Sequence, residues 1–368
     1  MKRFSTAALA IAATGLIAGS ASAATFTNHS STIDITEVKT YDIRAHGGIS
    51  TAWDAQAFPM DFANGTLYVA DQKINGQSTN IVAIDGILGA APTTKHIATT
   101  FTPQSDGNHM LNGLAADGNG NVVVTYRKSA WNYAGEATSF VAGIDTNNSQ
   151  QLFYKNGVDA GADPTGAAYN AEKDTFNFIA QGHNNLYNVA TDGTITDGTA
   201  GFLPGGGVAM ALDFDSEGNA ASIYGAASGA MKLLYHEYDA TTDTFTTSVI
   251  KEFTSSFADG YEVEIINGVT GDPMFAVSNP WTMTFDGETT APVTATIFDA
   301  AGGKVATVSE GKQGSKLSLA YDADTQTLFA APAYNKEVIV YNLAAVPEPA
   351  SMALLGLGGL LVLGRRRK

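Results

Sequence analysis

The chain has 368 residues, enough for two ordinary domains or one large all-β domain. Hydrophobic residues make up 44% of it, which argues against global disorder, and the absence of cysteine excludes disulfides, thiolate zinc sites and thiol catalysis. The formal charge of −16 disfavours binding to nucleic acids and anionic lipids.

The N-terminus has the three parts of a secretory signal peptide. Lys2 and Arg3 form a basic start, and a short apolar run follows at 7–19. Ala21-Ser22-Ala23 then supplies the small residues, including Ala21 and Ala23, that signal peptidase recognises. The apolar run is shorter than the about 20 residues of a permanent membrane helix. We therefore expect export of the protein and removal of residues 1–23.

The body of the chain reads as all-β, because short β-rich runs alternate with turns of Gly, Asn, Asp and Thr. A repeat is visible in it. The segment 168–176 (AYNAEKDTF) recurs at 320–328 (AYDADTQTL), 152 residues later, which equals three units of about 51 residues. In both copies a strand ends, a turn follows, and Thr begins a second apolar strand.

Six such units can be placed on the chain. Their second strands are expected to start near Leu67, Val122, Phe176, Ala220, Met274 and Leu328. Tight turns such as Asn64-Gly65 precede these strands, and Asn-Gly tolerates the positive φ that hairpins need. A third strand follows in most units, and a more variable fourth one in several. Six units of four strands predict a six-bladed β-propeller; the main alternative is a pair of β-sandwiches.

The last unit runs out after 337–343 without a fourth strand. Residues 35–43 (ITEVKTYDI) form an unassigned strand near the N-terminus, where a missing outer strand could come from. We expect these two segments to pair and close the ring, which would remove exposed edges and join the two ends of the domain. The propeller domain would then span residues 24–345.

The hairpins at 117–121 (DGNGN) and 215–219 (DSEGN) resemble those of NHL- and YVTN-type propellers, whose blades carry a hydrophobic–Asp–x–x–Gly–Asn–hydrophobic pattern. This resemblance implies a propeller fold for nearly the whole mature chain. The first of the two segments also begins like a calcium loop, with oxygen ligands at alternate positions. It lacks the following Gly and the closing Glu, so we interpret it as a hairpin turn.

Propellers commonly bind ligands at the mouth of the central channel, and polar residues are expected where the inner strands begin. The candidates for this channel-mouth site are Asp54, Asn108, His109, Asn112, Asp163, Asp259 and Glu262. Similar lactonase-like propellers use Asp, Asn and Glu to hold a divalent cation, and hard oxygen ligands would suit Ca²⁺. The alternative is that these residues only solvate one face of the propeller.

Signatures of catalysis are missing from the sequence. It contains neither HExxH nor G-x-S-x-G, and its six histidines are scattered. Trp131 and Tyr133, in a long polar connection, are candidates for stacking against a sugar. The sequence thus favours a non-enzymatic propeller without a required cofactor, which binds a glycan or a surface protein. The alternative is a Ca²⁺-dependent enzyme, either lactonase-like or a polysaccharide-active hydrolase or lyase.

The chain closes with Val-Pro-Glu-Pro, a 15-residue apolar run at 350–364, and a basic cluster at 365–368. As a helix the run would be roughly 22 Å long, against about 30 Å of hydrocarbon in a bilayer. The basic cluster would stay cytoplasmic, which places the propeller outside the inner membrane. The run is thus marginal as a lasting anchor.

This order of parts in 346–368 resembles PEP-CTERM sorting signals, the tags that exosortases of Gram-negative bacteria recognise. The resemblance implies transient membrane insertion, processing near Pro347, Glu348 and Pro349, and a final place at the cell surface or outside the cell. It also implies a link to exopolysaccharide or biofilm. An ordinary C-terminal anchor is the alternative. Loss of both ends would leave 14 basic and 35 acidic residues, a formal charge of −21.

Overall fold

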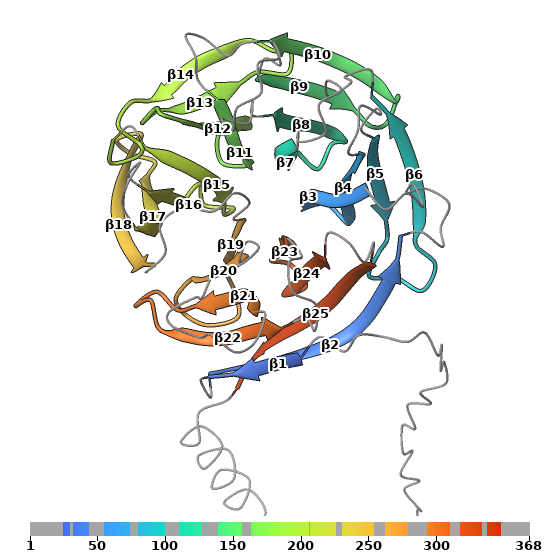
Figure 1. The fold of residues 1–368 in the computed structure, drawn as a ribbon, viewed down its shortest axis with the longest axis vertical. Coiled ribbons are helices and arrows are strands. Elements are labelled where there is room, and N and C mark those ends of the chain that lie inside the picture. Colours follow the sequence, from blue (N-terminus) through green and yellow to red (C-terminus); the bar gives the residue numbers. More distant parts are fainter. Residues whose placement is uncertain are drawn as a thin grey trace, which may run out of the picture.

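The computed structural model describes residues 25–29, 32–43, 55–73, 80–99, 111–126, 139–156, 163–205, 207–225, 230–253, 262–278, 293–309, 317–332 and 337–346. Every element within them is a β-strand, and the strands form six sheets arranged as a ring around a central axis (Figure 1). The predicted all-β, six-bladed propeller is therefore confirmed, and the sandwich pair is excluded. In this described part of the chain, no helix has the length and apolarity needed to cross a bilayer.

The first three blades are antiparallel sheets whose strands follow one another from the axis outward. Blade one consists of β3 (Ala55–Ala63), β4 (Thr66–Lys73), β5 (Asn80–Asp85) and β6 (Thr93–Ala98). Blade two consists of β7 (Leu111–Ala116), β8 (Asn121–Tyr126), β9 (Phe140–Asp145) and β10 (Gln150–Asn156). Blade three consists of β11 (Asp163–Asn170), β12 (Thr175–Gln181), β13 (Leu186–Val189) and β14 (Ile195–Thr199).

The last three blades repeat this order, and two of them add a strand from the N-terminus. Blade four consists of β15 (Val208–Phe214), β16 (Ala220–Gly225), β17 (Met231–Asp239) and β18 (Thr244–Glu252). Blade five consists of β19 (Val263–Ile266), β20 (Met274–Ser278), β21 (Val293–Phe298), β22 (Lys304–Ser309) and β1 (Thr25–Asn28). Blade six consists of β23 (Leu317–Asp322), β24 (Thr327–Pro332), β25 (Glu337–Ala345) and β2 (Ile33–Asp42).

The repeat seen in the sequence corresponds to the hairpin between the first and second strands of each blade. All six predicted second-strand positions fall in the second strands β4, β8, β12, β16, β20 and β24. The turn of blade one shows why the local signal is reliable: Asn64 has φ 47° and Gly65 has φ 84°, both left-handed. Few residues other than Asn and Gly adopt this conformation readily.

The hydrophobic core is divided among the interfaces between neighbouring blades. Each of its six clusters joins residues from two adjacent sheets; Phe329 of blade six, for example, packs with Leu67 and Val69 of blade one. A middle strand is therefore buried on both faces, and every residue of β16 is buried. This is why such strands read as continuous apolar runs rather than as alternating ones.

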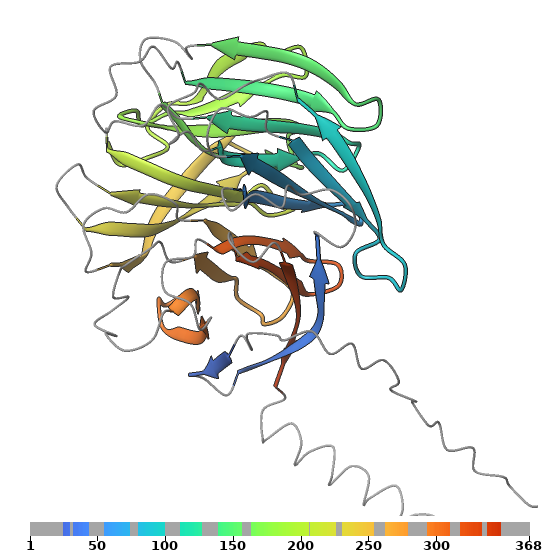
Figure 2. The same cartoon turned by 45° about the vertical axis from the view of Figure 1, so that its right-hand side comes forward.

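The N-terminal strand β2 closes the ring, as predicted. It pairs antiparallel with β25 in a register that places Ile35 opposite Leu343 and Tyr41 opposite Val338. Figure 2 shows β2, in blue, alongside β25, in dark red. The Lys39 ammonium also donates to the Ile87 carbonyl of blade one at 3.1 Å, so the strand links three segments that are distant in the sequence.

A second N-terminal strand, β1, was not predicted. It pairs with β22 at the outer edge of blade five, where Phe26 lies opposite Val308. The N-terminal segment thus extends two neighbouring blades, with β1 on blade five and β2 on blade six. At the other end of the domain, the Val346 N–H donates to the Thr32 carbonyl at 2.9 Å, so the pairing of the two chain ends continues to the last described residue.

Candidate functional site

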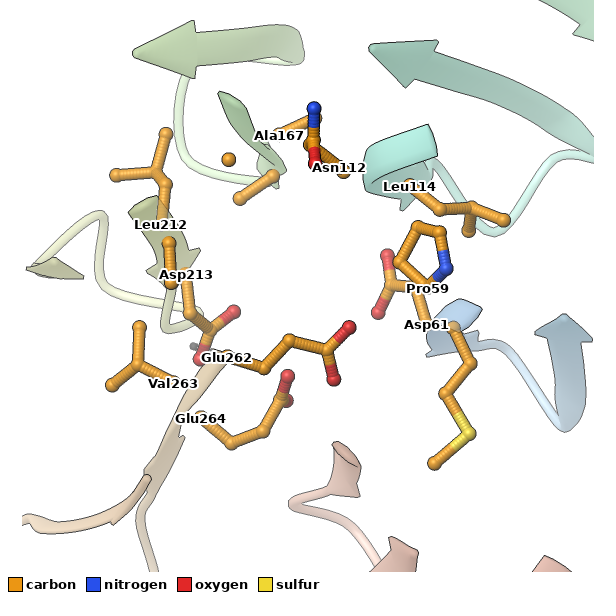
Figure 3. Close-up of a pocket in the computed structure, with 15 residues that line it drawn as sticks. Pro59, Asp61, Asn112, Leu114, Ala167, Leu212, Asp213, Glu262, Val263 and Glu264 are labelled. Carbon is orange, nitrogen blue, oxygen red and sulfur yellow. The ribbon is translucent and has the colours of Figure 1, made fainter. Parts of the chain in front are cut away.

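Four acidic side chains point toward one another across the central channel (Figure 3). Asp61 belongs to β3, Asp213 to β15 and Glu264 to β19, and Glu262 immediately precedes β19. Because every blade contributes its innermost strand to the axis, residues from blades one, four and five meet there although they are far apart in sequence. We call these four residues the channel carboxylates.

Asp61 and Asp213 occupy equivalent positions on their strands. Asp61 lies opposite Tyr68 and Asp213 opposite Ala221, and both partners come one residue after the repeat positions Leu67 and Ala220. In blades two, three and six the same register position holds an alanine, namely Ala115, Ala168 and Ala320. An acidic side chain is therefore a property of particular blades rather than of the repeat.

All four channel carboxylates accept a hydrogen bond from a backbone N–H on the inner strand of the next blade. Asp61 Oδ2 accepts from the Ala116 N–H at 2.8 Å, and Asp213 Oδ2 accepts from the Ile265 N–H at 2.7 Å. Glu264 accepts in the same way from the Tyr321 N–H. The inner strand of a blade has no neighbouring strand on its channel side, so these carboxylates satisfy backbone donors that would otherwise face the channel.

Glu262 joins blades five and six through its two oxygens. Ser318 donates its hydroxyl to both of them at 2.9 Å, and the Leu319 N–H donates to Oε2 at 2.6 Å. Its own N–H donates to the Ser278 hydroxyl at 2.7 Å. Glu262 is buried, and these donors match the acceptor capacity of an ionised carboxylate.

Burial raises the pKa of Asp61 from its ordinary 3.8 to about 7, and the backbone N–H groups of Ala116 and Phe62 offset only part of this rise. Burial also raises the pKa of Asp213 and of Glu264 well above their ordinary values. The charges of neighbouring channel carboxylates add to the rise at both residues. No Lys, Arg or His is among the described residues that line the channel, so the cluster carries no basic countercharge.

The channel has a narrow part and a wide part. At the narrow part, which we call the neck, the four channel carboxylates and Asn112 line a space of about 30 Å³, room for little more than a water molecule. Where the inner strands end, the channel widens into a cavity of about 420 Å³, which we call the turn-side cavity. Asp61, Asp213 and Glu264 line both parts.

A metal centre is not formed by the described residues. No three His, Cys, Asp or Glu side chains within them lie close enough together to hold a metal ion. The channel carboxylates point toward a common space, but their oxygens are turned to backbone and hydroxyl donors of neighbouring blades. This donor set does not fit the close oxygen cage of Ca²⁺.

The structure places two of the predicted channel-mouth residues at the channel, since Asn112 and Glu262 both line the neck. Asp163 begins β11, and only its backbone is described. The remaining predicted residues lie outside the described residues: Asp54, Asn108, His109, Asp259, Trp131, Tyr133, Ala21, Ala23, Pro347, Glu348 and Pro349. The predicted site where the inner strands begin therefore stays a prediction.

Asp61, Asp213 and Glu264 are not among the residues that the sequence predicted for the channel. The expected site lay where the inner strands begin, whereas Asp61 and Asp213 lie toward the ends of β3 and β15, and Glu264 is the second residue of the short strand β19. A usable signal was present, because an isolated acidic residue interrupts the apolar segments VAMALDF (208–214) and VEII (263–266). Such a residue in a buried strand needs a polar partner, which points to the channel.

The segment 117–121 forms a hairpin turn between β7 and β8, as predicted, and the structure shows that the Asp117 carboxylate is used inside this turn. Asp117 Oδ1 accepts from the N–H groups of Asn119 and Asn121 at 2.8 and 2.9 Å. The turns that begin at Asp215 and Asp299 repeat the same two bonds, to the second and fourth following residues. The oxygens that would bind calcium in a calcium loop hold a tight turn here.

A second polar cluster lies inside blade four. His236 Nε2 is hydrogen-bonded to the Ser222 hydroxyl at 2.8 Å, and His236 Nδ1 is hydrogen-bonded to the Thr247 hydroxyl at 2.9 Å. The imidazole ring stacks on Phe202. Burial lowers the pKa of His236 to about 3. Ser222 is fully buried, so this Ser–His pair is inaccessible to a substrate and acts as part of the core.

Comparison with known proteins identifies the tail and the fold. A model of the PEP-CTERM protein-sorting motif matches residues 345–368. No curated protein matches the sequence.

Two solved structures resemble this one in fold. An auxiliary nutrient binding protein from Bacteroides ovatus is 12% identical with a TM-score of 0.51, and the match covers 85% of this chain and 77% of that one. A gluconolactonase from Xanthomonas campestris is 11% identical with a TM-score of 0.50, and the match covers 88% and 94%. The chain is therefore a six-bladed β-propeller that carries a PEP-CTERM sorting motif at its C-terminus, which marks it for exosortase processing and for export to the surface or the exterior of the cell.

Proposed function

We propose that this propeller works at the cell surface or in the extracellular matrix as a binding or scaffold protein rather than as an enzyme. The proposal rests on the hydrogen bonds that the channel carboxylates accept. They hold backbone donors of neighbouring blades, and in an enzyme of this architecture the same region would present free catalytic or metal-binding oxygens. The accessible part of the described channel offers no nucleophile paired with a base.

The processing that we propose has two steps. Signal peptidase removes residues 1–23, and an exosortase then acts near Pro347 while the apolar run at 350–364 is inserted in the inner membrane. Removal of the tail agrees with the position of the last strand, β25, which ends at Ala345, before the Pro-Glu-Pro element. The tail can therefore be removed without loss of a strand.

A glycan or a surface protein is the ligand that we propose, in keeping with a role in exopolysaccharide or biofilm. Trp131 and Tyr133 remain candidates for stacking on a sugar ring. The solved nutrient binding protein shares only the fold, so it does not identify the ligand. The runner-up function is a Ca²⁺-dependent lactonase-like or polysaccharide-active enzyme.

Calcium dependence separates the two functions. We expect the melting temperature of the purified protein to be the same in excess EDTA and in millimolar CaCl₂, and the protein to bind polysaccharide isolated from its host without shortening it. Trp131→Ala should weaken that binding, whereas Tyr154→Ala, at an exposed position on β10, should not. A rise in melting temperature with CaCl₂ together with cleavage of the polysaccharide or of a lactone would establish the enzyme instead.

A further inference from the structure

The outer strand of blade four has an open edge. β18 pairs with β17 on one side, and no described strand lies on its other side, at the rim of the ring (Figure 1). Its residues 244–250 (TFTTSVI) carry no charge, in a chain with a formal charge of −16. Thr, Phe, Val and Ile are favoured in strands. A neutral run of this composition at the edge of a sheet is a template for another strand.

The other described outer strands are each blunted. Edges are commonly protected from further pairing by shortness, charge or a bulge. β1 and β14 have only four and five residues, and β14 carries Asp197. β10 has a bulge at Leu152 and a charge at Lys155, β2 has a bulge at Val38, and β6 carries Lys95. Among the described outer strands, β18 is thus the one with a long, neutral and regular edge.

The free part of this edge runs from Thr244 to Val249, and we call it the open edge. The register between β17 and β18 is regular over these residues and shifts only at Ile250. A turn of blade five contacts the strand there, because Gly302 approaches the Ile250 carbonyl so closely that a Cβ would lie 2.2 Å from its oxygen. The bulge and this contact together end the open edge.

The backbone polar groups of three residues point outward from the open edge. In an antiparallel pair, successive residues direct their N–H and C=O groups alternately toward the partner strand and away from it. The Tyr238 N–H donates to Asn219 Oδ1 at 2.9 Å and so points away from β18. Phe245 lies opposite Tyr238, so its own N–H and C=O point outward. By the same alternation, those of Thr247 and Val249 point outward as well.

These three residues form a self-complementary pattern. When two copies of the edge run antiparallel with Thr247 opposite Thr247, Phe245 of each copy meets Val249 of the other. The outward N–H and C=O groups of all three residues then find partners, and this is the one register that pairs all three. The side chains match too, because Thr–Thr and aromatic–β-branched pairs are favourable neighbours across strands.

This pairing would also cover apolar surface on the edge. The Val249 side chain is 51% exposed, and Phe245 is half-buried against the core cluster that contains Phe214. Phe245, Thr247 and Val249 point to the same face of the sheet, because they are spaced two residues apart. Val249 of one copy therefore packs against the Phe245 ring of the other.

The charges at the two ends of the open edge favour the antiparallel arrangement. On β17, β18 and the turn between them, the N-terminal end of β18 is flanked by Asp239 and Asp243, and the C-terminal end by Lys232, Lys251 and Glu252. Even with Lys173 of blade three bound to Asp243, the first end keeps an excess negative charge and the second an excess positive one. Antiparallel copies bring these opposite ends together.

We propose that the open edge joins two copies of this protein in a two-fold dimer. β18 of one copy pairs antiparallel with β18 of the other, so the two four-stranded sheets of blade four form one continuous sheet. The contact uses the same edge of both copies and therefore ends at two. It is separate from the glycan or protein site proposed above and does not depend on it.

Cysteine crosslinking tests the register, since the natural chain contains no cysteine. Thr247→Cys places a thiol opposite its own copy across the two-fold axis. Thr196→Cys is the matched control, at an exposed position on the outer strand β14. With the full chain in mild detergent at tens of micromolar, we expect a short bismaleimide to convert most of Thr247→Cys to a covalent dimer and to leave Thr196→Cys monomeric.

Sedimentation velocity of the same full chain measures the affinity. An edge contact buries little surface, so we expect a dissociation constant on the order of 10 µM. Val249→Lys places a charge beside Phe245 of the other copy and should weaken the dimer at least about tenfold. Val38→Lys, which adds the same charge at an exposed position of β2, should leave the affinity unchanged.

Three results would overturn the proposal. One is a wild-type chain that stays monomeric at about tenfold the expected dissociation constant. Another is equal crosslinking of Thr196→Cys and Thr247→Cys, which would show random collision or association through another part of the chain. The third is an equally tight dimer in Val249→Lys and Val38→Lys, which would place the contact elsewhere. Circular dichroism checks that the variants remain folded, and the wild-type measurement does not depend on any of them.

Discussion

Acidification from pH 7 to pH 4 is expected to destabilise the propeller through His236. Burial lowers the pKa of this side chain to about 3, whereas a histidine in the unfolded chain titrates near 6.5. Below pH 6.5 the unfolded state binds a proton that the folded state excludes, so the free energy of unfolding falls as the pH falls. For 2.5 pH units the loss is about 3 kcal/mol.

The variant His236→Gln isolates this effect. It should be less stable than wild type at pH 7, because it loses the ring stacking on Phe202 and part of the bonding to Ser222 and Thr247. The difference between wild type and variant, measured by urea denaturation, should shrink by about 3 kcal/mol between pH 7 and pH 4. Thr247→Val keeps the imidazole and should keep the acid dependence of wild type. A constant difference between wild type and His236→Gln would contradict a buried neutral histidine.

The channel carboxylates are expected to lower the stability of the propeller as the pH rises, opposite to the effect of His236. The pKa of Asp61 is raised to about 7 in the folded protein, so between pH 3.8 and pH 7 the folded state holds a proton that the unfolded state releases. The free energy of unfolding therefore falls as the pH rises through this window, by about 4 kcal/mol at most for Asp61 alone. The raised pKa values of Asp213 and Glu264 add in the same sense.

Asp61→Asn should therefore stabilise the protein at pH 8 by a few kcal/mol, on the order of the 4 kcal/mol above, and have little effect at pH 4. The Asn oxygen can still accept the Ala116 N–H, so the link between blades is kept. Asp239→Asn is a matched control at the exposed end of β17, where hydrogen bonds from Thr241 and Thr242 lower the pKa of the carboxyl. That substitution should destabilise at pH 8. A less stable Asp61→Asn at pH 8 would mean that a bound cation already compensates the carboxylate.

Between pH 3.8 and 6.5, a rise in pH increases the free energy of unfolding through His236 and decreases it through the channel carboxylates. The pH dependence of wild-type stability therefore cannot separate the two contributions. The profile of each variant relative to wild type separates them, since the difference for His236→Gln reports the histidine and the difference for Asp61→Asn reports Asp61 with the channel carboxylates that its charge affects.

The architecture was predictable from sequence because its signals are local. Turn residues such as Asn64-Gly65 fix each hairpin, and the apolar runs mark strands buried between blades. The closing strand at 35–43 was found by counting, since the sixth unit was one strand short. β1 was missed because four residues, TFTN, show no period, and their partner β22 lies near the other end of the chain.

The channel carboxylates were not predictable as a set. Whether a side chain on an inner strand faces the axis or a neighbouring blade depends on the twist and register of the closed ring, which no local pattern encodes. Asp61 and Asp213 occupy the same register position, where three other blades have alanine, so the repeat itself gave no warning of them. Glu262 was named because it lies at the start of a strand, and the structure gives it a partner in Ser318.

Intact mass spectrometry of the protein isolated from its own host tests the central claim most directly. An exported propeller that is complete without its tail should begin at Ala24 and lack Arg365–Lys368, while its urea denaturation midpoint equals that of a recombinant chain ending at 346. A mature protein that retains residues 1–23 and the basic cluster at 365–368 would contradict the account.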